Sequence, residues 1–189
     1  MIAFTASVLA LLLAGPSAAG AASFTLEPQQ RTDALKVGAE SITRDSFDTE
    51  WRVTNQSGET LMVITPFHRL VLAARNAAFK NQRMKESEPE KLLREQQDRL
   101  VIWANLHGRR EDFARFYAPR ILLNDREIEP TFVQNERTAL RTEGGGYLAR
   151  CVYGFPVKDL SPKGRVVLVV RDPDGKDVTR FTIDLASMR

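Results

Sequence analysis

The sequence has few residues that can carry covalent or metal chemistry. It contains one cysteine and two histidines among 189 residues, and a single cysteine excludes an intramolecular disulfide. Neither His68 nor His107 has another histidine or cysteine at i+2, i+3 or i+4, so the spacing of a zinc site is missing. We therefore expect no metal, no cofactor and no catalytic residues. Both histidines are expected to be surface or capping residues.

The single cysteine lies in a segment whose apolar residues alternate. In YLARCVYGFP, residues 147–156, every second residue from Tyr147 to Phe155 falls on the same face of a strand as Cys151. That face is the more consistently apolar one, and a free cysteine in such surroundings behaves as a small hydrophobic residue. We expect Cys151 to fill the core. The alternatives are a reactive thiol and an intermolecular disulfide.

Two other segments resemble ligand-binding loops but lack a required residue. The acidic run DPDGKD, residues 172–177, has its glycine at the fourth position, whereas a calcium loop of the EF-hand type requires glycine at the sixth. The glycines at 144–146 precede a strand pattern instead of the helix that a phosphate-binding loop requires. Turn formation explains the acidic run, and the sequence has no G-x-S-x-G motif of a hydrolase.

Long apolar runs are missing after the first residues of the chain. Residues 2–13 are uncharged and mostly apolar, and Pro16 and several small residues follow. This pattern predicts a secretory signal peptide over residues 1–22, cleaved near Ala21 or Ala22. No cysteine lies near this site to carry a lipid anchor, and no later stretch suits a transmembrane helix. We expect a periplasmic or secreted protein whose residues 23–189 form a single domain.

The excess of one sign of charge over the other is also small. The 27 basic and 24 acidic residues leave a net charge of +3 and are interleaved along the chain. Such a small excess indicates solubility rather than a polyanionic partner, so we expect no nucleic-acid binding.

The body of the chain reads as many short strands separated by turns. The strongest pattern is RVVLVVRDPDGKDVTRFTIDL, residues 165–185, in which Pro173 and Gly175 mark the turn of a β-hairpin. Further strands are predicted upstream, at 49–54, 61–64, 100–106, 113–123 and 148–155. For 100–106 the alternative is a helix that ends near Gly108, but β-branched and aromatic residues favour the strand.

Helix formers interrupt the strands at one place. Residues 87–98, SEPEKLLREQQD, contain a capping box at Ser87 and Glu90 and predict a short helix. A second, weaker helix pattern covers residues 71–84. The sequence therefore predicts a mainly β fold, an antiparallel sandwich with a short helical insertion at about residues 70–98.

Three segments together resemble a known class of domain: VTNQSGE at 53–59, RILLNDREIEPT at 120–131, and the run from Tyr153 to Leu185. In these segments the chain is similar to bacterial immunoglobulin-like β-sandwich domains of the cell envelope, found in extracellular proteins of unknown function. The resemblance spans roughly residues 47–185 and implies the fold. It brings no catalytic residues with it.

One basic stretch has the composition of a protein interface. Residues 109–117, RREDFARFY, interleave arginine with aromatic residues, and Arg120 follows. The candidate partner-binding residues are Arg109, Arg110, Phe113, Arg115 and Arg120. In the alternative interpretation Phe113 and Tyr117 face the core and the arginines are simply solvated.

These observations favour an exported, non-enzymatic accessory or protein-binding module of the bacterial cell envelope, with an envelope protein as its partner. Two other functions stay open. One is a small-ligand carrier with a pocket under the helical insertion at 70–98. The other is an envelope hydrolase or thiol enzyme that uses Cys151 or His107.

Overall fold

The computed structural model describes residues 23–124 and 126–189. The predicted signal peptide, residues 1–22, lies outside the described residues, and so does its cleavage site. The described chain is mainly antiparallel β structure, with 34% strand and 25% helix, which confirms the predicted mainly β class. Within the described ranges no helix is both long and apolar enough to cross a bilayer.

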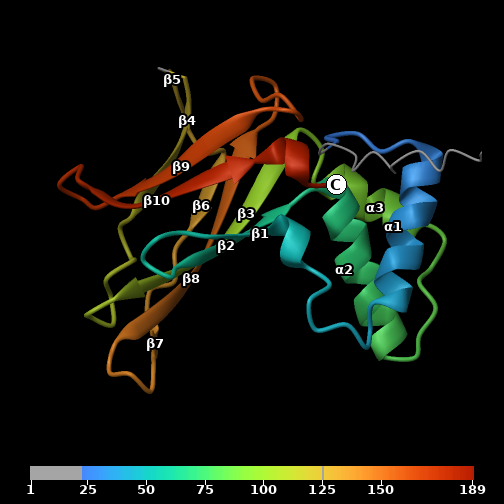
Figure 1. The fold of residues 1–189 in the computed structure, drawn as a ribbon, viewed down its shortest axis with the longest axis horizontal. Helices are drawn as coiled ribbons and strands as arrows, with labels where there is room; N and C mark the ends of the chain where they lie inside the picture. Colours follow the sequence, from blue (N-terminus) through green and yellow to red (C-terminus); the bar gives the residue numbers. More distant parts are fainter. Residues whose placement is uncertain (1–22, 125) are drawn as a thin grey trace, which may run out of the picture.

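The strands form two antiparallel sheets (Figure 1). The first sheet has the order β1 (Arg52–Thr54), β2 (Thr60–Ile64), β3 (Arg99–Gly108), β8 (Tyr147–Pro156) and β6 (Phe132–Gln134), and β7 (Leu140–Arg141) also pairs with β8. The second sheet has the order β10 (Asp177–Asp184), β9 (Arg165–Arg171), β4 (Ala118–Leu123) and β5 (Arg126–Ile128). The predicted strand over 100–106 is therefore correct.

The core lies between the two sheets, where strand alternation turns apolar side chains inward. On β8 the buried residues include Ala149, Cys151 and Tyr153, and on β10 they include Phe181 and Ile183. The predicted alternation of both segments is thus confirmed. The β9–β10 turn also follows the prediction, since Gly175 has a φ of +79° that glycine adopts without strain. A register shift between Asp177 and Thr179 marks a bulge at the start of β10.

Three helices lie side by side at one end of the sheets (Figure 1). They are α1 (Pro28–Glu40), α2 (Pro66–Phe79) and α3 (Glu88–Glu95). Short 3-10 helices occupy Thr49–Trp51 and Leu185–Ser187. In the same view the β1–β2 and β9–β10 turns extend away from the helices. The helical part is therefore larger than the predicted insertion at 70–98, because it includes α1 and the first turn of α2.

The α1 helix was not predicted because its sequence is mostly polar. Of its residues only Ala34 and Gly38 are buried, so it shows no apolar stripe of the usual width. Its docking depends on close approach: a Cβ atom added at Gly38 would lie 2.4 Å from the backbone oxygen of Val71 on α2. Its first turn is fixed by a capping box, in which the Glu27 backbone amide donates to Gln30 Oε1 at 2.9 Å.

Several predicted boundaries are wrong for local reasons. Strand 113–123 begins only at Ala118, because three successive turns occupy the residues before it. Strand 49–54 begins at Arg52, after a 3-10 turn. The capping box at Ser87 does not form: its backbone is already helical, and its side chain makes no capping hydrogen bond. The helix predicted at 71–84 is α2, displaced to Pro66–Phe79 by Thr65, which accepts from the His68 amide at 3.0 Å.

The prediction for His68 is wrong as well. The imidazole is fully buried in the first turn of α2 and stacks on Trp51, with ring centroids 4.1 Å apart and planes inclined by 4°. Its Nδ1 atom lies 3.0 Å from the Val63 carbonyl oxygen, whereas Nε2 has no hydrogen-bond partner among the described residues. His107, by contrast, is exposed on β3 as predicted.

Candidate protein-binding surface

Four of the five predicted binding residues lie in the connection between β3 and β4, which links the two sheets. This connection, residues 109–117, folds into successive turns, with backbone hydrogen bonds from Phe113 to Arg110 and from Tyr117 to Ala114. Ala114 is buried at the centre of these turns. The connection is therefore a folded loop whose outer residues have fixed positions relative to the sheets.

Two aromatic side chains anchor this loop. Phe113 and Tyr117 contact each other edge to face, with ring centroids 5.8 Å apart, and both pack against the core. Phe113 lies directly over Gly108: a Cβ atom added there would be 2.2 Å from the ring. Asn135 donates to the Tyr117 carbonyl oxygen at 2.8 Å. Phe113 is thus half-buried as an anchor, as the alternative interpretation of this stretch expected.

The exposed aromatic residue of the loop is Phe116. Its side chain is 67% exposed, and the guanidinium of Arg115 lies 5.1 Å from the centre of its ring. Arg109 and Arg110 are exposed on the same loop, and Arg110 makes only a 3.8 Å ion pair with the exposed Asp112. We call the group Arg109, Arg110, Arg115 and Phe116 the loop surface.

The fifth predicted residue, Arg120, does not belong to the loop surface. It lies on β4 between the buried residues Pro119 and Ile121, so its side chain points to the outer face of the second sheet. There it pairs with Glu129 at 3.3 Å and donates to the Pro119 carbonyl oxygen at 2.8 Å. Three of the predicted arginines, Arg109, Arg110 and Arg115, therefore lie exposed on one loop, whereas Arg120 lies on β4.

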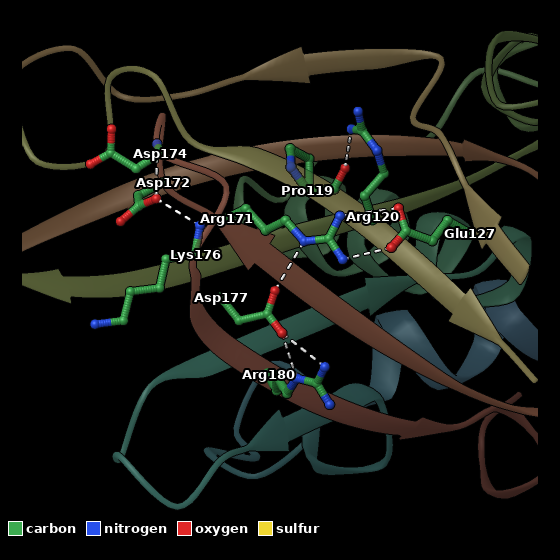
Figure 2. Close-up of polar contacts among 9 residues, drawn as sticks. All are labelled: Pro119, Arg120, Glu127, Arg171, Asp172, Asp174, Lys176, Asp177 and Arg180. Atoms are coloured by element: carbon green, nitrogen blue, oxygen red, sulfur yellow. Dashed lines mark hydrogen bonds and ion pairs between the residues drawn. The ribbon is translucent and has the colours of Figure 1, made fainter. Parts of the chain in front are cut away.

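Arg120 borders a group of charged residues on this outer face (Figure 2). Arg171 donates to Glu127 at 2.6 and 3.1 Å and to Asp177 at 3.0 Å, and Asp177 also accepts from Arg180 at 2.8 Å. The hydrogen bonds from Arg171 lower the pKa of both carboxyl groups. These side chains are solvated and satisfy one another, so this face offers few free charges to a partner.

The acidic turn beside this group uses its carboxylate for the backbone. Asp172 Oδ1 accepts from the amides of Asp174 at 3.0 Å and Lys176 at 2.9 Å, as the predicted turn chemistry requires (Figure 2). Over residues 23–124 and 126–189, no three His, Cys, Asp or Glu side chains gather where a metal ion could bind.

Sequence reasoning missed a buried polar cluster beneath the loops. Glu59 is only 7% exposed. Its carboxylate accepts hydrogen bonds from the side-chain amide of Asn55 at 2.9 Å, from the Thr179 hydroxyl and from the backbone amide of His107 at 3.0 Å. Asn55 also donates to Thr179 at 2.8 Å. The cluster ties the β1–β2 turn to β3 of the first sheet and to β10 of the second. The turn motif N-Q-S-G-E was visible in the sequence, but its distant partner Thr179 was not.

Cys151 lies in the core and not at the surface. It is 1% exposed on β8 opposite Ala104, and burial raises the pKa of its thiol. On β3 the buried Ala104 and Leu106 face the core, so His107 points to the opposite side of the sheet. His107 is therefore not placed to act as a base for Cys151.

We expect Cys151 to react with a thiol reagent about 100-fold or more slowly in the native protein than after unfolding, because exposure requires opening of the core. The measurement is the labelling rate with and without denaturant. A matched control is Ser57→Cys in a Cys151→Ala background, since Ser57 is exposed in the β1–β2 turn. Native labelling of Cys151 as fast as this control would restore the thiol-enzyme hypothesis.

The comparisons with known proteins provide no relative for this chain. No family model matches it, and neither the curated proteins nor the solved structures contain a match.

Proposed function

We propose that this chain is an exported, non-enzymatic accessory module of the bacterial cell envelope that binds a protein partner through the loop surface. The observation that carries the proposal is the 67% exposure of Phe116 beside the Arg115 guanidinium. Aromatic residues and arginine are enriched in the parts of protein interfaces that contribute most binding energy. An immunoglobulin-like fold, which we propose on the sequence resemblance and the two antiparallel sheets, presents its binding loops at strand ends.

The anchoring of the loop supports this role. Phe113 is held against Gly108, Tyr117 is held by Asn135, and the buried Glu59 cluster fixes the neighbouring turn. A loop that is already ordered loses little conformational entropy on binding, so more of the contact energy appears as affinity.

Substitution of Phe116 by serine should weaken binding to the partner by about tenfold or more, because it removes the aromatic side chain that becomes buried in the complex. The partner is first trapped by a photo-crosslinking amino acid at Arg110, in the cells that encode the protein. Its affinity is then measured for the wild type and the variants. Because Phe79 on α2 is 74% exposed, Phe79→Ser is the matched control and should bind like the wild type.

Two outcomes would contradict the proposal. One is the absence of any crosslinked protein from position 110 while the purified chain stays a monomer. The other is an equal loss of affinity in Phe116→Ser and Phe79→Ser, which would mean that the loop surface is not the specific contact.

A further inference from the structure

The three helices, which we call the helical layer, line two adjoining hollows, one mostly apolar and one rich in cations. The first has a volume of about 510 Å³ and lies between α1, α2 and the segment that leads into α3. Its lining is mostly apolar, from Leu35, Ala39, Ala74, Ala77, Ala78, Met84 and Pro89, and the other lining residues are Gln82, Arg83, Lys85 and Glu86. We call it the apolar hollow.

The second hollow has a volume of about 350 Å³ and lies between α2, α3 and β3. Three cationic side chains line it, from Arg69, Lys80 and Arg83, and only one carboxylate, that of Glu88. None of the three cations makes an ion pair with any residue that the structure describes. This cationic hollow therefore has positive charge available for a ligand.

The two hollows share part of their lining. Ala77, Gln82, Arg83 and Met84 line both hollows, so the apolar space and the cationic one adjoin along the end of α2 and the segment that follows it. A ligand that spans both must have an apolar body joined directly to an anionic group. Fatty-acid-like amphiphiles have this chemistry.

We propose that the helical layer binds a single-chain anionic amphiphile, with its hydrocarbon chain in the apolar hollow and its head group in the cationic hollow. Both volumes fall within the range of about 300–1,000 Å³ that is typical of small-molecule sites, which are mostly apolar with a few placed polar groups. An acidic amphipathic helix would be the alternative occupant, and the experiment below distinguishes it from the amphiphile. This inference concerns a surface other than the loop surface and does not depend on a protein partner.

Titration calorimetry with dodecanoate, below the concentration at which it forms micelles, tests the proposal on the purified chain. We expect saturable binding of one molecule. Octanoate should bind at least about tenfold more weakly, because each methylene moved out of water contributes to affinity. Dodecyltrimethylammonium, which has the same chain and a positive head group, should bind at least about tenfold more weakly as well.

Two variants locate the site. Arg83→Glu replaces an exposed cation that lines both hollows, so it should fold normally and weaken dodecanoate binding by about tenfold. Arg110→Glu makes the same change of charge on the loop surface and should leave the affinity within about twofold of the wild type. Equal binding of the anionic and cationic amphiphiles would overturn the proposal. So would an equal effect of the two variants, or binding of an acidic helical peptide without binding of dodecanoate.

Discussion

Between pH 6.5 and about pH 4 the free energy of unfolding should fall by about 3 kcal/mol because of His68 alone. Burial of the imidazole lowers its pKa from 6.5 to about 4 in the folded protein. The unfolded chain takes up the proton at pH values where the folded protein excludes it, so acid favours unfolding. Each pH unit between the two pKa values contributes about 1.36 kcal/mol.

The pH window follows from the direction of this pKa change. Above pH 6.5 the imidazole is neutral in both states, and its titration has no effect on stability. The loss begins as pH falls through 6.5 and is complete below about 4. The hydrogen bond to the Val63 carbonyl oxygen and the charge of the nearby Asp48 both raise the pKa of His68, but together they do not overcome the effect of burial. Urea denaturation at a series of pH values measures the change.

His68→Gln provides the comparison, because glutamine does not titrate and its amide retains a donor for the Val63 carbonyl oxygen. Other groups titrate in acid too, including Glu127 and Asp177, whose pKa values are lowered by Arg171. They remain in the variant and cancel in the difference between the two proteins. Parallel curves for the wild type and His68→Gln would show that His68 is not the source of the acid sensitivity.

Replacement of Glu59 by alanine should lower the free energy of unfolding by about 3 kcal/mol. The change removes the acceptor of three donors: the buried Thr179 hydroxyl, and the partly buried Asn55 side-chain amide and His107 backbone amide. Each unsatisfied donor costs about 1–3 kcal/mol, and partial access of water offsets part of the sum. Chemical denaturation measures the effect, with Glu86→Ala at an exposed position expected to stay within about 0.5 kcal/mol of the wild type.

A double-mutant cycle identifies the mechanism. Thr179→Val removes one of the donors, so Glu59→Ala should cost less in that background than in the wild type, by about 1 kcal/mol. Additive effects of the two substitutions would mean that the Thr179 hydroxyl does not bind the carboxylate. The hydrogen bond from the Asn55 side chain to Thr179 would then be what joins the cluster to β10.

The parts of the fold that the sequence predicted are those governed by local pattern. The strands β3, β8, β9 and β10 alternate or are rich in branched residues, and Gly175 marks the hairpin turn. The burial of Cys151 followed from the same alternation. In these segments, neighbours along the chain settle both the strand and its inward face.

The features that escaped prediction depend on contacts between distant segments. The α1 helix has little apolar surface, and its docking depends on the absence of a side chain at Gly38. His68 was predicted to be a surface or capping residue, because the sequence does not show that Trp51, from a separate segment, stacks on its imidazole. At the candidate site, the alternative interpretation of 109–117 already placed Phe113 towards the core, but the exposure of Phe116 could be seen only once the turns were known. Neither hollow of the helical layer corresponds to a motif in the sequence, because the lining residues come from separate elements.

The edges of the two sheets limit how this protein can associate. The edge strands β1, β5, β6 and β7 have no more than three residues each. Among the strands that the structure describes, only β10, with eight residues, offers a long edge, and its bulge and the charged side chains of Asp177 and Arg180 disfavour addition of a further strand. The described sheet edges therefore disfavour association by strand addition, and the protein partner that we propose would contact side chains instead of extending a sheet.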